Sequence, residues 1–139
     1  MTVVIDSNVL MSALIKDSST GKILIESGLE FAFPEISMQE ITKHKQLILQ
    51  KGGYSEGELQ KIMNKLLEYI KLIPTQIIQP KLAEATRIMG SIDVHDVVFI
   101  ATALALNAKI WSEDNDFERQ NRVGVLKTKD LIDQFEKDS

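Results

Sequence analysis

Short apolar segments rich in β-branched residues alternate with helical segments along the whole chain. Five segments have the length and composition of strands. They are Thr2–Ile5, Leu29–Phe33, Lys71–Pro74, Lys109–Ser112 and Arg122–Leu126. Because parallel strands need a crossover connection that is usually a helix, this alternation predicts an α/β sandwich with a mainly parallel central sheet of about five strands.

Helical periodicity fills the stretches between these strands. The clearest helix follows Ser55, which with Glu58 has the form of a capping box, and carries apolar residues from Leu59 to Ile70 at helical spacing. Gly52 and Gly53 stop the preceding helix, so the two form a helical hairpin at about residues 36–70, a candidate clamp or dimer arm. The other predicted helices are Asn8–Lys16, Thr20–Ser27, Pro34–Gln50, Lys81–Met89, Val94–Leu106 and Thr128–Glu136.

Length and composition indicate one soluble domain over residues 1–139. No run reaches the roughly 18 apolar residues of a membrane span, and the first residues are predicted to form a strand and not a signal peptide. The chain has no cysteine, which excludes disulfides, thiolate catalysis and cysteine-based zinc sites and agrees with a cytoplasmic location.

Four carboxylates stand where a strand or loop passes into a helix or turn: Asp6, Glu40, Asp96 and Asp114. In a parallel sheet the ligand site lies beyond the carboxyl ends of the strands, so these side chains are expected to converge on one crevice. Two like charges about 4 Å apart repel by roughly 4 kcal/mol at an effective dielectric constant of about 20. A hard divalent cation such as Mg²⁺ or Mn²⁺ removes that repulsion.

Helix capping is the competing explanation for two of these acids. Asp6 precedes a predicted helix and is a favoured capping residue, although Asn8 is then available to orient its carboxylate as part of a site. Glu40 completes a capping box with Ser37, and only an earlier helix start at Pro34 leaves it free to reach outward.

Two further acids accompany the other pair. Asp93 lies three residues before Asp96, so both share a helical face, where they cap the helix, complement its dipole or bind metal. His95 between them is more typical of a surface residue than of a ligand. Asp116 follows Asp114 in an acidic turn that lacks the glycine of a calcium-binding loop.

The net charge of −4 gives no general basic footprint for nucleic acid. Lysines nevertheless cluster locally. The cluster has two interpretations: a solvated helix face, or a patch that contacts phosphates. The lysines concerned are Lys43, Lys45, Lys51, Lys61 and Lys65.

The order of the acidic motifs is specific. The chain resembles the PIN-domain ribonucleases over essentially its whole length, and most closely the small VapC-type toxins. The segments that carry the resemblance are Val4–Leu10, Ile36–Ile41, Asp96–Ala103 and Ile110–Phe117.

The resemblance implies a three-layer α/β/α fold whose acidic pocket binds Mg²⁺ or Mn²⁺ and cuts RNA. The pocket acids carried over are Asp6, Glu40, Asp96 and Asp114, with Asp93 and Asp116 as auxiliary acids. Ser112 stands where the family often has threonine, and its hydroxyl is expected to bind a phosphate or water. The resemblance also implies that the helical arm supports homodimer formation and contacts a small antitoxin protein.

The favoured hypothesis is therefore a metal-dependent endoribonuclease that is the toxin of a toxin–antitoxin pair. The alternatives are an RNA-processing nuclease that is not a toxin, and a catalytically silent domain that binds RNA or a partner. A phospho-acceptor signalling module is disfavoured, because its acceptor aspartate would end the third strand, where this chain has Pro74-Thr75-Gln76.

Overall fold

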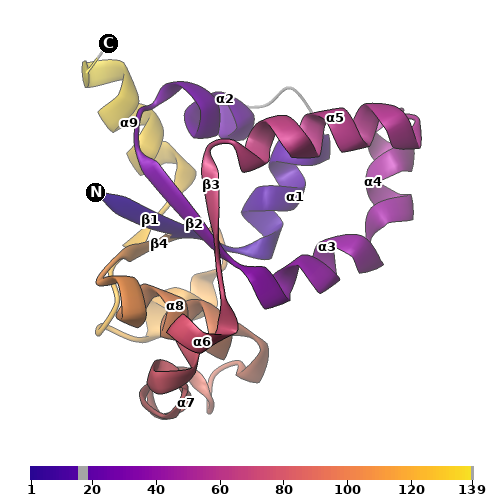
Figure 1. The fold of residues 1–139 in the computed structure, drawn as a ribbon. Helices are drawn as coiled ribbons and strands as arrows, with labels where there is room; N and C mark the ends of the chain where they lie inside the picture. Colours follow the sequence, from indigo (N-terminus) through magenta and orange to yellow (C-terminus); the bar gives the residue numbers. More distant parts are fainter. Residues whose placement is uncertain (16–18, 139) are drawn as a thin grey trace.

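The computed structural model describes residues 1–15 and 19–138. Its core is a five-stranded, entirely parallel sheet with the strand order β3-β2-β1-β4-β5 (Figure 1). The predicted α/β fold is thereby confirmed. The strands are β1 Thr2–Ile5, β2 Glu30–Pro34, β3 Ile70–Ile73, β4 Lys109–Trp111 and β5 Val125–Leu126.

Helices cover both faces of the sheet (Figure 1). Helices α1 (Ser7–Ile15), α2 (Ser19–Glu26) and α9 (Thr128–Asp138) lie on one face. The other face is covered by α6, α7 and α8, with α8 packed against β1, β2 and β4. These helices are α6 Thr75–Ile78, α7 Leu82–Met89 and α8 Val97–Leu106, and 3₁₀ turns precede two of them, η2 at Gln79–Lys81 and η3 at Val94–Asp96.

The core between the sheet and α8 includes the whole apolar part of β1. Val3, Val4 and Ile5 are fully buried, as expected for a strand covered by helices on both faces. Helix α8 is apolar around most of its circumference, and its Phe99 ring lies 6.0 Å from that of Phe33 on β2. Burying each large apolar side chain contributes roughly 1.5–3 kcal/mol, so this helix is fixed firmly on the sheet.

The segment between β2 and β3 differs from the prediction of one helix over Pro34–Gln50. It consists of the 3₁₀ turn η1 (Glu35–Ser37) and two helices, α3 (Met38–Lys43) and α4 (Lys45–Gly52). The single-helix prediction is wrong because His44 leaves helical geometry, with φ −99° and ψ 13°, while its ring Nδ1 lies 2.8 Å from the Glu40 carbonyl oxygen.

Helix α5 (Glu56–Leu67) returns from this excursion towards β3, so α3, α4 and α5 form an arch beside α1 (Figure 1). The capping box of Ser55 and Glu58 is present as predicted. Gly53 ends α4 with φ +67°, a left-handed conformation that favours glycine. The role of residues 36–70 as an arm stays a prediction.

Smaller differences have local causes. Strand β5 begins at Val125, later than predicted, because the Gln120 side chain occupies the backbone groups before it. Its Oε1 accepts hydrogen bonds from the Arg122 and Val123 N–H groups at 2.9 and 2.8 Å. Ile70 belongs to β3 and not to the preceding helix, and the short helix α6 was not predicted. The predicted last residue of the first helix, Lys16, lies outside the described residues.

Two global features bear on function. Strand β3 lies at the edge of the sheet, whereas receiver-type signalling modules place their third strand centrally, so the topology argues against that alternative. Within the described ranges, none of the helices combines the length and apolar character that a membrane crossing requires.

Candidate metal centre

The strand order reverses between β1 and β4, the two strands that start the halves of the sheet. In open parallel sheets, ligand sites form beyond the carboxyl ends of the strands at this switch point. Asp6 follows β1, and Ser112 with Asp114 follows β4. Asp96 is added from the start of α8, which packs across the same strands. The fold thus brings together residues that are far apart in the sequence.

Four aspartates form the tightest cluster at this point. One carboxylate oxygen from each lies within 4.8 Å of those of all the others. The members are Asp93, Asp96, Asp114 and Asp116. The family resemblance implies only an auxiliary role for Asp93 and Asp116, whereas in the structure they belong to the cluster on equal terms with Asp96 and Asp114.

Backbone hydrogen bonds hold two of the four carboxylates. Asp93 accepts one from the His95 N–H at 2.8 Å, so it caps the turn η3. Asp114 accepts one from the Asp116 N–H at 2.9 Å and caps the turn η4, Asn115–Arg119. Capping and metal binding are compatible here, because each cap uses only part of a carboxylate's acceptor capacity.

Asp96 is the least compensated member of the cluster. Burial, together with the charges of Asp93 and Asp114, raises its pKa to about 7. Among the described residues, its Oδ2 and the Oγ of Ser7 are the buried side-chain oxygens without a hydrogen-bond partner. A buried carboxylate oxygen facing other carboxylates is what a hard cation would satisfy, so the residues fit a divalent metal ion.

Asp6 lies beside the cluster and is more deeply buried, with 4 % of its surface exposed. Its Oδ1 accepts a hydrogen bond from the Val9 N–H at 2.9 Å, which caps α1. Its Oδ2 accepts one from the Ser112 hydroxyl. Burial raises the pKa of Asp6, and these two hydrogen bonds oppose the rise. The predicted capping role is therefore present without removing Asp6 from the site.

Ser112 connects Asp6 to the cluster. Its hydroxyl donates to Asp6 and accepts a hydrogen bond from the Asp114 N–H at 2.9 Å. The side chain is fully buried. This geometry suits Ser112 to position the Asp6 carboxylate. It does not support the expected contact of the hydroxyl with phosphate or water, because the hydroxyl is buried and is already bonded to Asp6 and Asp114.

Glu40 stands apart from the four aspartates but within electrostatic range of Asp6. Its charge contributes, after that of Asp114, to raising the pKa of Asp6. The capping box with Ser37 is absent, because Ser37 itself is helical and makes no capping hydrogen bond. Glu40 is exposed in the first turn of α3, as expected from the earlier helix start at Pro34.

Two other predicted residues lie outside this arrangement. Asn8 is exposed and makes no hydrogen bond to Asp6 in the described part of the chain, so Val9 and Ser112 orient that carboxylate instead. His95 is exposed and contributes its backbone N–H to Asp93, and its ring is not part of the acidic cluster.

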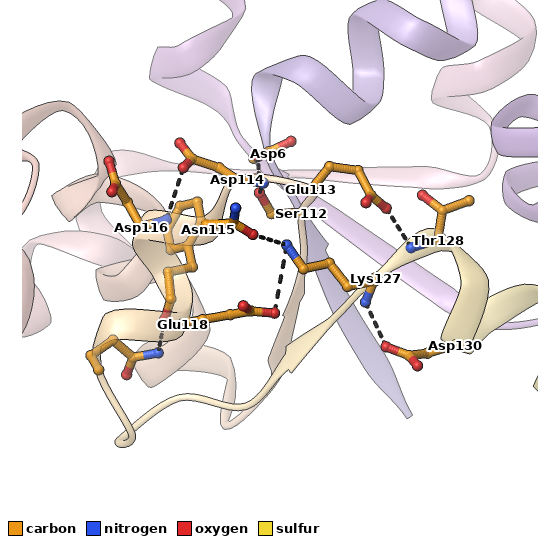
Figure 2. A network of polar contacts seen from close by, with 12 residues as sticks. Asp6, Ser112, Glu113, Asp114, Asn115, Asp116, Glu118, Lys127, Thr128 and Asp130 are labelled. Atoms are coloured by element: carbon orange, nitrogen blue, oxygen red, sulfur yellow. Dashed lines mark hydrogen bonds and ion pairs between the residues drawn. The ribbon is translucent and has the colours of Figure 1, made fainter.

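The turn that carries Asp114 and Asp116 is held from the other side by the start of α9 (Figure 2). The Lys127 ammonium lies 3.2 Å from the Asn115 side-chain oxygen and 3.6 Å from the Glu118 carboxylate. The Thr128 N–H donates to Glu113 at 2.6 Å, and the Thr128 side chain, together with this N–H contact, lowers the pKa of Glu113. No local sequence motif predicts these contacts, because they join segments that lie close together only in the folded protein.

Comparison with known proteins agrees with this geometry. The sequence profile of the PIN domain matches residues 4–131. No curated protein sequence matches the chain.

Two solved structures share the fold. One is VapBC2 from Rickettsia felis bound to a DNA fragment from its promoter, with a TM-score of 0.69, 16% identity, and coverage of 91% of this chain and 98% of the other. The second is a toxin–antitoxin complex from Klebsiella pneumoniae, with a TM-score of 0.65, 16% identity, and coverage of 91% and 97%. Because the PIN-domain profile spans most of the sequence, the chain belongs to the PIN-domain family.

Proposed function

We propose that this protein is a divalent-metal-dependent endoribonuclease that hydrolyses RNA phosphodiester bonds. The observation that carries the proposal is the cluster of Asp93, Asp96, Asp114 and Asp116, in which the buried Oδ2 of Asp96 has no partner. Membership of the PIN-domain family supports a nuclease. Mg²⁺ or Mn²⁺ is the expected ion, because all the candidate ligands are carboxylate oxygens.

The four aspartates would hold the cation, with Asp6 as a further ligand directly or through water. A divalent ion held there would lower the pKa of an attacking water and offset the negative charge that develops on the phosphoryl oxygens. The water oxygen forms a bond to phosphorus, the bond from phosphorus to the leaving ribose oxygen breaks, and that oxygen takes up a proton. Substitution of either Asp96 or Asp114 should therefore remove the reaction.

The chain itself supplies orientation. Ser112 and the Val9 N–H fix the Asp6 carboxylate, so that it does not rotate when substrate arrives. Glu40 is exposed beside Asp6 and is suited to accept a hydrogen bond from the attacking water. Glu40 would thus position the attacking water, and Asp6, held by Val9 and Ser112, would complete the ligands around the four-aspartate cluster.

The biological role proposed is that of a toxin neutralised by a small antitoxin protein in the cytoplasm, with the toxin acting as a homodimer. The support is the fold shared with VapBC2 from Rickettsia felis and with the toxin–antitoxin complex from Klebsiella pneumoniae. An RNA-processing nuclease without a toxin role uses the same chemistry, whereas the intact acidic cluster disfavours a silent binding domain.

Cleavage of total RNA by the purified protein tests the activity. Cleavage is expected with Mg²⁺ or Mn²⁺ and not with excess chelator, and Asp96→Asn and Asp114→Asn should each abolish it with the circular dichroism spectrum retained. Asp133→Asn on α9 is the matched control, since it removes an exposed carboxylate that is not a member of the cluster. Full activity in chelator, or in both cluster variants, rules out the proposed reaction.

Expression in a bacterial host tests the toxin role separately. Growth arrest is expected with the wild type and not with Asp96→Asn, and co-expression of a small reading frame adjoining the gene should relieve the arrest. Unimpaired growth together with metal-dependent cleavage in vitro would favour the RNA-processing alternative.

A further inference from the structure

An open cavity lies on the side of α3, between Glu40 and the start of α8 that follows Asp96. It encloses about 350 Å³. Its walls come from the segment η1–α3 and from the first turn of α8, directly after Asp96. The lining residues are Ile36, Ser37, Gln39, Glu40, Lys43 and Val98.

One face of the segment η1–α3 supplies most of this lining. Ile36, Gln39, Glu40 and Lys43 follow one another at i, i+3, i+4 and i+7, the spacing of a single helical stripe. The opposite side of the helix is buried through Ile41. The stripe therefore faces the cavity and links Glu40, which is near Asp6, to Lys43 at the end of α3.

Lys43 is a cation for which the described part of the chain provides no partner. Its side chain is exposed and forms no ion pair or hydrogen bond within residues 1–15 and 19–138. Its neighbour Lys45, by contrast, is paired with Glu56 at 3.4 Å. An uncompensated ammonium one helical turn from Glu40 is available to an anion that approaches the acidic crevice.

The apolar residues of the cavity are also unusually open. Ile36 is 47% exposed, and Val98 on the facing helix is only partly buried. An apolar pair beside a cation and the Gln39 amide matches an unpaired nucleotide, which presents a base face, polar base edges and a phosphate.

We infer that this cavity is a subsite for the nucleotide next to the scissile phosphate of a single-stranded RNA. Lys43 binds that nucleotide's phosphate, Gln39 bonds to its base edge or ribose hydroxyl, and the base lies against Ile36 and Val98. The inference rests on the proposed ribonuclease function and adds the path of the substrate along α3. It also identifies Lys43 as the phosphate-contacting lysine of the cluster seen in the sequence, since the neighbouring Lys45 is paired with Glu56.

An acidic peptide is the competing occupant, because it would also be attracted to Lys43. A peptide carboxylate in this cavity would, however, be repelled by Glu40 and the four aspartates, and nothing would hold the peptide there. An RNA phosphate would meet the same repulsion, but it is covalently linked to the scissile phosphate, whose binding at the acidic cluster would hold it in the cavity. The geometry therefore favours RNA.

The test compares Lys43→Gln with Lys71→Gln, which removes an exposed lysine near the amino end of the edge strand β3. The probe is a fluorescent 2′-O-methyl oligonucleotide that matches a sequence the wild type cleaves, titrated by anisotropy at several salt concentrations. Lys43→Gln should weaken binding roughly three- to tenfold and reduce the salt slope by about 0.7, one phosphate contact on a single strand. Lys71→Gln should match the wild type.

A set of probes with one uncharged methylphosphonate each locates the contact. One position should weaken binding to the wild type and have no effect on Lys43→Gln. Equal binding by Lys43→Gln and Lys71→Gln, while the wild type still cleaves RNA, overturns the subsite and leaves the nuclease function standing.

Two other results also decide the matter. If the wild type neither cleaves RNA nor binds single-stranded oligonucleotides of mixed sequence, the proposed function fails and the subsite with it. If an acidic peptide binds the wild type but not Lys43→Gln, and oligonucleotide affinity is unchanged by the substitution, the cavity is a protein-binding site and the inference is wrong.

Discussion

At the scale of single residues, the site is a set of carboxylates whose protonation is decided by one another. Asp96 has the most perturbed environment, because burial and two neighbouring carboxylates oppose its charge. Asp6 is buried as well, but hydrogen bonds from Val9 and Ser112 offset part of its burial. We therefore expect these two residues to respond differently to pH and to substitution.

The pKa of about 7 for Asp96 predicts how stability depends on pH without metal. In the unfolded chain the carboxyl titrates near 3.8, so between about pH 4 and pH 7 the folded state binds more protons than the unfolded state. The contribution of Asp96 to stability is therefore fully present below pH 4 and is lost as pH rises through 7.

Asp96→Asn isolates that contribution. The difference between the folded and unfolded pKa of Asp96 corresponds to about 4 kcal/mol of unfolding free energy. Because Asp96 is partly exposed, we expect a contribution of roughly 1–2 kcal/mol. In chelator, the variant should exceed the wild type in unfolding free energy by this amount at pH 8 and by much less at pH 4. Urea unfolding across this range measures it, and a difference that does not change with pH contradicts the environment described for Asp96.

Ser112→Ala removes the hydroxyl that joins Asp6 to the Asp114 backbone. We expect the pKa of Asp6 to rise further, and RNA cleavage to fall roughly 10- to 100-fold, as for other residues that orient metal ligands. Ser112→Thr keeps the hydroxyl and should retain more activity than the alanine variant. Equal activity of the alanine variant and the wild type would show that Asp6 needs no such support.

At the scale of secondary-structure elements, the acidic cluster depends on turns as much as on strands. Asp93 and Asp114 each cap a 3₁₀ turn, so the conformations of η3 and η4 decide where the carboxylates lie. The start of α9 holds η4 through Lys127 and Thr128 (Figure 2). The geometry of the acidic cluster is thus coupled to a helix that contributes no carboxylate to it.

Lys127→Met tests that coupling, because methionine fills the same space without the ammonium. We expect the unfolding free energy to fall by about 1 kcal/mol or less, and the affinity for Mn²⁺, measured by calorimetry, to fall about tenfold as η4 loosens. Lys129→Met, two residues along α9 and exposed, is the matched control. A loss of stability without any loss of Mn²⁺ affinity would show that the contacts of Lys127 with η4 do not affect metal binding.

At the scale of the whole molecule, the alternation of segments was sufficient to predict a parallel α/β fold. Features that depend on neighbouring residues were also predictable, such as the Ser55–Glu58 capping box. The box at Ser37 was misleading because helical geometry already begins at Glu35, after Pro34, so Ser37 is inside the turn and no longer at a cap.

The candidate site was predictable only in outline. Its acids are recognisable at element boundaries, but their grouping depends on the strand order, which no local pattern encodes. The hydrogen bond from Ser112 to Asp6 spans 106 residues, and the ion pair of Lys127 with Glu118 joins two separate elements. Consequently the equal standing of Asp93 and Asp116, and the support from α9, emerge only in the folded molecule.

The central claim is that the four aspartates hold a divalent cation, since the proposed chemistry depends on it. Anomalous diffraction from crystals grown with Mn²⁺ tests it most directly. The account predicts an anomalous peak among the carboxylates of Asp93, Asp96, Asp114 and Asp116, and its loss in Asp96→Asn. No peak at saturating Mn²⁺, or a peak elsewhere in the molecule alone, would contradict the account.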